Sequence, residues 1–335
     1  MTMIVPGLLV VYAFAVAAAG TRWLPRASWT RRLPRLGIAA WQVLTVAFVA
    51  SVLLAGLLIA IPCLPDGVNL DAAAELRDHY SSARGIAIGS TAAAASLTVI
   101  GRLLWAAASA MAIARRRRAL HDDTLVLVGR PGPVPGIVVL DDDRPLVYCL
   151  PGRGRVVVTS GALSRLDRAQ LQAVVAHERA HLSARHHLVI MLARVLPDAF
   201  PGIRFLAIAA DQIGGLVETA ADDSAARHHR LPLALALMAL ATSPVPAPAL
   251  GAARTAGAQR IRRLLDTPRP GSAVGRAAGF TVTVLAAPVL ALAVPVCALL
   301  IAPRCLDRPV HQPPAVSAPR TPLPSASVAL NMGLD

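Results

Sequence analysis

Long apolar stretches constrain this chain more than any other feature of its sequence. A transmembrane helix needs roughly 20 mostly apolar residues. Only 16% of the 335 residues are charged, whereas about a quarter are charged in a typical soluble domain. Four stretches meet the length requirement, at residues 3–19, 36–63, 85–114 and 279–302. We therefore predict a multi-pass α-helical membrane protein with four spans.

The first stretch has a second interpretation, because an N-terminal apolar run can also be a cleaved secretory signal. A signal peptide carries its positive charge before the apolar run. Here the arginines come after the run, beginning at Arg22. This order favours an uncleaved membrane anchor.

The distribution of arginine predicts the orientation, since short loops rich in Arg or Lys face the cytoplasm. Loop 21–35 holds five arginines and no acidic residue, and Arg115 to Arg118 follow the third stretch. Loop 64–84 mixes both charges. The N-terminus and the C-terminal tail are therefore expected outside, and the segment between spans three and four inside, at a cell membrane. Arg102 falls near the inner interface, where its side chain can reach water.

Four parts follow from this pattern. Residues 1–118 hold three spans and their loops, 119–276 form a cytoplasmic domain, 279–302 form the fourth span, and 303–335 form a proline-rich, disordered external tail. The inserted domain is expected to be α+β. Expected strands are 124–128, 136–140, 146–150 and 155–159, and expected helices are 167–187, 199–213, 216–229, 233–242 and 252–265. Asp167 and Gln170 have the spacing of a capping box.

The four cysteines show no zinc-finger spacing. By the predicted topology Cys63 and Cys305 both lie outside, in a compartment that permits a disulfide between them. Cys149 and Cys297 are most simply small buried hydrophobic residues.

The central motif is His177-Glu178-Arg179-Ala180-His181. Residues i and i+4 share one face of a helix, so both imidazoles can bind one metal ion. Glu178 lies beside them and can deprotonate a metal-bound water. A catalytic zinc site takes three protein ligands and leaves a fourth position open.

Glu218 is the only glutamate after the motif and is the candidate third ligand. Asp222 lies one helical turn further, where its carboxylate can bond the far nitrogen of a ligating histidine and fix its tautomer. One Zn²⁺ per chain is therefore expected. The alternative is a surface helix that happens to carry two histidines and a glutamate.

Residues 150–161, 171–181 and 218–222 resemble the integral-membrane gluzincins. These include the HtpX-type, CAAX-prenyl-protease-type and BlaR/MecR-type peptidases. The resemblance implies a zincin-like metalloprotease domain in which His177, His181 and Glu218 bind zinc and Glu178 is the base. It also implies an edge strand that pairs with extended substrates, matched here by Val156, Val157, Val158 and Thr159.

One departure limits this resemblance. BlaR/MecR-type receptors carry a large external domain, acylated at a serine with a nearby lysine. This chain has a short tail instead and no lysine at all. Direct β-lactam sensing by that chemistry is therefore excluded.

Other basic residues have two readings. One set follows Asp222 and could stabilise an oxyanion or form a solvated basic cluster: Arg227, His228, His229 and Arg230. His186 and His187 face at least partly away from the motif by helical phase, so we assign them no role. Another set is expected to face acidic lipid, namely Arg260, Arg262 and Arg263. No nucleic-acid motif accompanies it.

Three functions remain open. The leading one is a zinc endopeptidase (a hydrolase) that cuts membrane or cytoplasmic proteins. The second uses the same chemistry to cleave a transcriptional repressor after a signal. The third is a non-catalytic membrane scaffold. The expected partners are a protein or peptide substrate and the lipid bilayer, and the second function would add the repressor.

Overall fold

The computed structural model describes residues 4–60, 83–132, 135–241 and 250–266. The predicted fourth span and tail lie outside the described residues. So do Cys63, Cys297 and Cys305, and with them the predicted disulfide.

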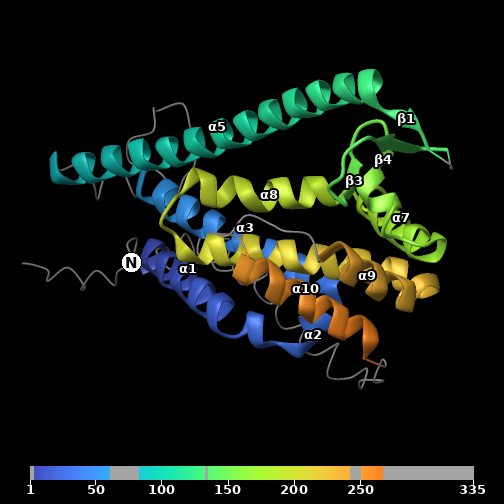
Figure 1. Ribbon diagram of the computed structural model, residues 1–335. Helices are drawn as coiled ribbons and strands as arrows, with labels where there is room; N and C mark the ends of the chain where they lie inside the picture. Colours follow the sequence, from blue (N-terminus) through green and yellow to red (C-terminus); the bar gives the residue numbers. More distant parts are fainter. Residues whose placement is uncertain (1–3, 61–82, 133–134, 242–249, 267–335) are drawn as a thin grey trace, which may run out of the picture.

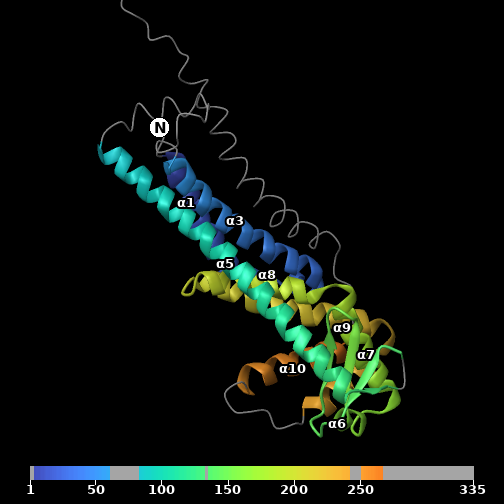
Figure 2. The same cartoon turned by 90° about the horizontal axis from the view of Figure 1, so that it is seen from above.

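Three described helices are long and apolar enough to cross a membrane: α1 (Ile4–Arg22), α3 (Pro34–Ala60) and α5 (Ala83–Val128). They correspond to the first three predicted spans. Figure 2 shows them side by side, with the remaining elements gathered toward one end. A short 3₁₀ turn (η1, Leu24–Arg26) and α2 (Ser28–Arg32) join α1 to α3.

Helix α5 is longer than the predicted span and crosses the predicted boundary at residue 118 without a break (Figure 1). The predicted strand 124–128 is wrong, because these residues are the last turn of α5. Extending an existing helix is easier than starting a new element. No glycine or proline interrupts the chain between Arg102 and Gly129, so β-branched residues at its end did not stop the helix.

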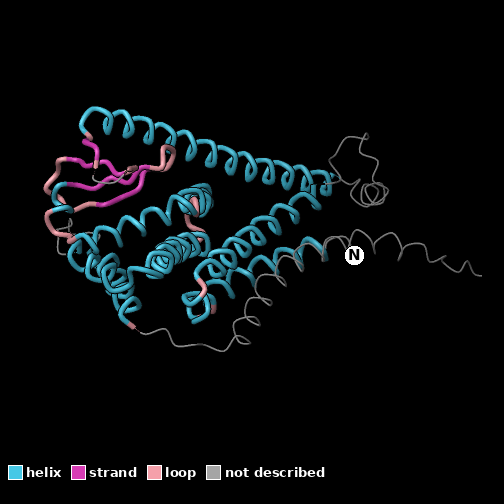
Figure 3. Tube along the Cα trace, turned by 90° about the vertical axis from the view of Figure 1, so that its right-hand side faces the viewer, coloured by secondary structure: helices cyan, strands magenta, loops and turns pink. Residues whose placement is uncertain are grey.

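The other three predicted strands are confirmed and form one small sheet (Figure 3). It consists of β1 (Arg130–Pro131), β2 (Ile137–Leu140), β3 (Val147–Leu150) and β4 (Arg155–Thr159), in the order β1-β2-β4-β3. Strand β4 pairs parallel with β2 and antiparallel with β3. The prediction that Val156 to Thr159 form an edge strand is therefore wrong. The edge on that side of the sheet is β3.

The helices after the sheet hold the candidate site. They are α6 (Ser160–Leu163), α7 (Arg168–Ser183), α8 (His186–Ala199), α9 (Arg204–Ala241) and α10 (Leu250–Leu265). The capping box of Asp167 and Gln170 is present at the start of α7. Three predicted helices are a single α9, which continues through Gly214 and Gly215 and bends at His229, three residues before Pro232.

Two large apolar cores stabilise this arrangement, and α9 contributes to both. The membrane-side core joins α1, α3, α8 and the first part of α9; its largest members are Val16, Leu24, Ile38, Trp41, Leu44, Phe205, Leu206, Ile213, Leu216 and Val217. The sheet-side core joins the sheet, α7, the later part of α9 and α10; its largest members are Ile137, Val156, Val158, Leu166, Val174, Val175, Leu233 and Leu264.

Candidate metal centre

Helix α7 carries both histidines of the motif on one face, as the spacing predicts. The Nε2 atoms of His177 and His181 lie 3.1 Å apart. Both rings are largely buried, with 7% and 13% of their side chains exposed. The two nitrogens therefore point at one common position.

Helix α9 supplies the third predicted ligand. The carboxylate oxygens of Glu218 lie 3.6 Å from Nε2 of His177 and 3.6 Å from Nε2 of His181. One donor atom from each of these three residues lies within 4.8 Å of the other two. The structure thus brings together residues that are 41 and 37 positions apart in the sequence.

Asp222 lies behind His177, where the i+4 spacing from Glu218 placed it. Its Oδ1 is 3.1 Å from Nδ1 of His177, and its side chain is 2% exposed. Nδ1 of His177 is buried and has no aligned hydrogen bond. A small rotation of the imidazole would align this bond and fix the proton on Nδ1, which leaves Nε2 free to bind a metal.

The sequence reading missed Arg260, which it assigned to a lipid-facing cluster. Arg260 donates to both oxygens of Asp222, at 2.8 and 2.7 Å, and its Nη1 is 2.9 Å from Oε2 of Glu218. A sequence signal existed, because Arg260 precedes the apolar Leu264 by four residues and therefore shares its face of the helix. Leu264 is buried in the structure. Arg263 instead pairs with Asp223 and donates to the carbonyl of Arg31.

His186 is the second residue that the sequence reading missed. Its Nδ1 lies 3.1 Å from Nδ1 of His181, and the residue as a whole is 5% exposed. The prediction that it faces away assumed a helix continuing to residue 187. The helix ends at Ser183 instead, and Arg185 adopts a left-handed conformation (φ 50°) that turns His186 back toward the site.

The predicted base, Glu178, lies against the edge strand β3. Its carboxylate lies beside the thiol and the backbone N–H of Cys149. Burial raises the pKa of Glu178. Burial and the nearby Glu178 carboxylate raise the pKa of the Cys149 thiol to about 12. Cys149, read from the sequence as a simple hydrophobic residue, therefore contacts the candidate base.

Charge in the site is arranged to receive a cation. Burial lowers the pKa of His177, but the adjacent carboxylates of Asp222 and Glu218 outweigh this and raise it to about 9. Burial lowers the pKa of His181 to about 4. The pKa values of Glu218 and Asp222 fall despite burial, because His177 and Arg260 stabilise both carboxylates. Two ionised carboxylates around two imidazoles favour positive charge at this point.

The proposed oxyanion candidates are not part of this group. Arg230 donates to the carbonyls of Leu264, Arg263 and Asp266 at the end of α10. His228 and His229 contact each other. In the described part of the chain, the side chains that touch the three ligands include Asp222, Arg260 and His186, and none of Arg227, His228, His229 and Arg230.

The donor set fits zinc chemically. Two imidazole nitrogens and one carboxylate are a common set for catalytic zinc, which keeps one further position open. Each histidine also has a partner on its far nitrogen, as metal-ligating histidines almost always do. His177 faces Asp222, and His181 faces His186.

Comparison with known proteins gives a family match over this region. Residues 113–245 match the sequence profile described as "Peptidase family M48". The "Protease HtpX homolog" of Acidiphilium cryptum is 35% identical over 79 residues, which cover 23% of this chain and 28% of that protein. The "Protease HtpX homolog" of Thermodesulfovibrio yellowstonii is 30% identical over 86 residues, covering 25% and 30%. The chain thus spans less than a third of the length of these curated relatives.

Proposed function

We propose that this chain, whose residues 113–245 match the peptidase family M48 profile, is a membrane-bound zinc endopeptidase acting on membrane or cytoplasmic proteins. One observation carries this proposal. The donor atoms of His177, His181 and Glu218 converge within 4.8 Å, with Glu178 next to His177 on the same helix.

The proposed mechanism is hydrolysis of a peptide bond by an activated water. Zinc, when bound by His177, His181 and Glu218, polarises the scissile carbonyl and makes its water a better nucleophile at neutral pH. Glu178 accepts the proton of the attacking water and passes it to the leaving nitrogen. Its raised pKa suits a group that must both take and give a proton.

Substrate binding is proposed at β3 rather than at β4. An extended peptide can add to a free sheet edge through main-chain hydrogen bonds. Strand β4 is paired on both sides, whereas β3 has β4 as its only neighbour in the described sheet. Cys149 of β3 touches Glu178, so a peptide on this edge would pass next to the base.

The membrane arrangement is also part of the proposal. The arginine-rich loop between α1 and α3 and the arginines of α5 support an inner location for the catalytic region. The N-terminus would then lie outside, as would the tail after a fourth span. We keep the three-plus-one arrangement and the domain limits as predictions from the sequence.

The two alternative functions have less support. Cleavage of a transcriptional repressor requires the same site, and neither the site geometry nor the relatives named above favour such a substrate. A non-catalytic scaffold would have no need to retain Glu178, Glu218 and their partners together.

The proposal is tested by measuring cleavage of a loosely folded protein such as casein, with detergent-purified protein and added zinc. We expect Glu178→Gln to abolish cleavage while zinc remains bound. Glu218→Gln should reduce zinc content itself, measured by metal analysis after dialysis. Asp223→Asn is the matched control, because Asp223 is a half-exposed neighbour of Asp222 that pairs with Arg263. Full activity of the Glu178→Gln protein would contradict the assigned base.

A further inference from the structure

The position of the inner membrane surface can be read from the described helices. Helix α1 spans about 27 Å from Ile4 to Arg22 at 1.5 Å per residue. Ala83 to Arg102 of α5 spans about 28 Å on the same basis. Both lengths match a hydrocarbon core of roughly 30 Å. Arg22 and Arg102 therefore mark one level at the inner ends of two spans.

Tryptophans mark the same level. Trp23 follows Arg22 and is 74% exposed, and Trp105 lies one turn after Arg102 and is 76% exposed. Tryptophan is enriched at membrane–water interfaces, where its ring sits among the headgroups. Two exposed tryptophans beside two arginines on different spans are the pattern of such an interface.

The turn between α8 and α9 lies at this level. Nε and Nη2 of Arg102 donate to the carbonyl of Ala199, at 2.9 and 2.7 Å. A Cβ placed on Gly20, near the inner end of α1, would lie 2.7 Å from the ring of Phe205. Contacts from two spans thus place both ends of this turn beside the inner membrane boundary.

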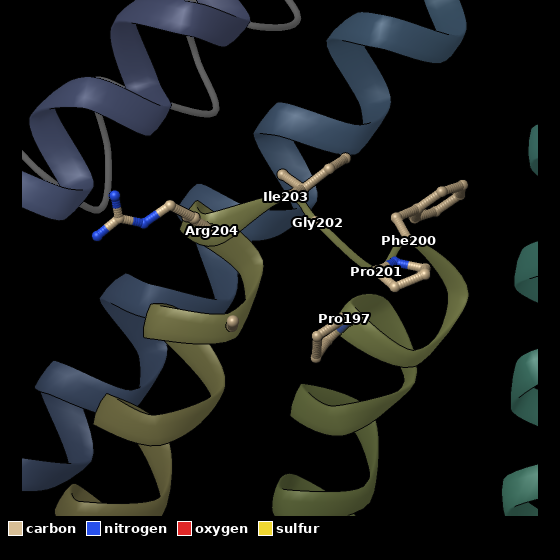
Figure 4. A pocket seen from close by; sticks show the side chains of 7 residues that line it. Pro197, Phe200, Pro201, Gly202, Ile203 and Arg204 are labelled. Carbon is tan, nitrogen blue, oxygen red and sulfur yellow. The ribbon is translucent and has the colours of Figure 1, made fainter.

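The turn itself suits contact with a membrane surface. Figure 4 shows the side chains of Phe200 and Arg204 pointing in opposite directions. The turn surrounds a cavity of about 210 Å³ whose lining is mainly apolar, formed by residues that include Pro197, Pro201 and Ile203. An apolar tip with a neighbouring arginine matches the boundary between acyl chains and headgroups.

The apolar run of α5 continues to Ala114, and four arginines follow it. A second placement would therefore put the inner membrane surface at Arg115. That placement would move the α8–α9 turn about 20 Å into the hydrocarbon, since Arg102 and Arg115 are 13 residues apart. Four exposed charged side chains would enter lipid with it, namely Arg194, Asp198, Arg204 and Asp211. Arg194 and Asp211 form an ion pair at 3.5 Å, but charged side chains are expensive in hydrocarbon even when two of them are paired.

The placement at Arg102 has a smaller cost. It leaves Leu104, Met111 and Ile113 of α5 beyond Arg102, where they are 66%, 39% and 52% exposed. Three partly exposed apolar side chains cost much less than four charges in lipid. The charges therefore decide in favour of the level of Arg102.

We propose that the inner membrane surface lies at Trp23, Trp105 and the α8–α9 turn, so that the metal centre stands below the bilayer and cleaves membrane proteins only several residues beyond their spans. This rests on the proposed function. Leu44 of α3 lies beside Gly20 at the inner end of α1, whereas Leu216, two residues before Glu218, lies beside Gly37. Leu44 and Gly37 are seven residues apart, which places the metal centre about 10 Å beyond this level. An extended substrate covers about 3.3 Å per residue, so about three residues bridge this gap.

Cleavage is measured in proteoliposomes with a model substrate. It consists of one transmembrane helix, a Gly-Ser spacer of two to twelve residues and a sequence that the detergent-purified protein cleaves. We expect cleavage at least tenfold slower with a two-residue spacer than with a ten-residue spacer. Equal rates within twofold would overturn the proposal. The same sequence without a span is the control, because loss of its cleavage would indicate failure of the peptidase function itself.

A second measurement needs no activity. Bilayers with lipids brominated near the headgroup or near the acyl-chain end quench tryptophan at different depths. The signal of Trp105 is the difference between wild type and Trp105→Phe, and that of Trp23 is obtained likewise. We expect both to be quenched mainly by the shallow bromines. Stronger quenching of Trp105 by the deep bromines would place it near the bilayer centre and overturn the proposed level.

Discussion

The membrane-side core and the sheet-side core are both apolar, yet they differ in what they border. The membrane-side core joins α9 to the spans through Trp41, Leu44 and Phe205. The sheet-side core packs the later part of α9 on α7 and α10, and the charged network of Asp222 and Arg260 lies beside it. Glu218 follows Leu216 and Val217 of the membrane-side core. The third ligand is thus held by packing on one side and by charge on the other.

This difference shows why the catalytic region is not independent of the spans. Helix α9 is a single element, and its packing partners include α1 and α3. A shift of either span would be transmitted through apolar contacts to the residue before Glu218. The site itself is then fixed by hydrogen bonds and ion pairs, which have stricter geometry than apolar contacts.

The largest effect is expected when the ion pair between Arg260 and Asp222 is removed. Arg260→Leu leaves the buried Asp222 carboxylate without its bidentate partner. Removing one member of a buried pair typically costs about 3–5 kcal/mol. We expect a lower thermal midpoint in detergent and a loss of zinc affinity.

The matched control is Arg263→Leu, which removes the neighbouring pair with Asp223. Its side chains are 33% and 42% exposed, and a surface pair contributes about 1 kcal/mol or less. Equal losses in the two variants would show that Arg260 contributes no more than a surface arginine.

An intermediate effect is expected at His186, which joins α8 to the site. If Nε2 of His181 held a metal ion, Nδ1 of His181 would carry the proton, and Nδ1 of His186, 3.1 Å away, would accept a hydrogen bond from it. Loss of such a partner typically lowers metal affinity about 10- to 100-fold. We expect His186→Leu to show this in a chelator competition assay.

His187→Leu serves as the control, because His187 is adjacent in sequence and has no contact with the three ligands among the described residues. Zinc affinity of His186→Leu within twofold of the control would remove His186 from the metal centre. His186→Gln offers an acceptor oxygen and should retain part of the affinity that His186→Leu loses.

The smallest effect is expected from a change in the membrane-side core, where α3 packs on α9. A Cβ on Gly37 of α3 would lie 3.0 Å from Leu216 Cδ1 and 3.0 Å from the carbonyl oxygen of Thr30. Gly37→Ala should therefore lower stability by about 1 kcal/mol, at the low end of overpacking costs. Zinc affinity should fall slightly as well, because Leu216 is two residues from Glu218.

Gly101→Ala is the control in another span, since nothing lies within 4 Å of a Cβ there. Alanine is favoured over glycine in a helix by up to about 1 kcal/mol, so this variant should be neutral or stabilising. A thermal midpoint that falls in Gly37→Ala but not in Gly101→Ala would show that close packing at Gly37 causes the loss. Equal changes in the two variants would contradict this role of Gly37.

Local spacing in the sequence determined much of the site. The i+4 interval of His177 and His181 placed both rings on one helix face, and the same interval linked Glu218 to Asp222. The long apolar stretches predicted the three described spans. Short apolar runs separated by turn residues predicted β2, β3 and β4. These features depend on residues close in the chain, whose relation is set by helix and strand geometry.

Tertiary structure decided the rest, because it depended on contacts between distant segments. Arg260 is 38 residues from Asp222, and its partner could not be read from a basic cluster on α10. His186 enters the site only because the chain reverses at Arg185, where a non-glycine residue adopts φ 50°. Strand β4 is interior because it pairs with β2 on one side and with β3 on the other, although β3 separates β2 from β4 in the sequence. Local propensity fixes an element, whereas packing and pairing with remote elements fix which of its faces and edges are left for function.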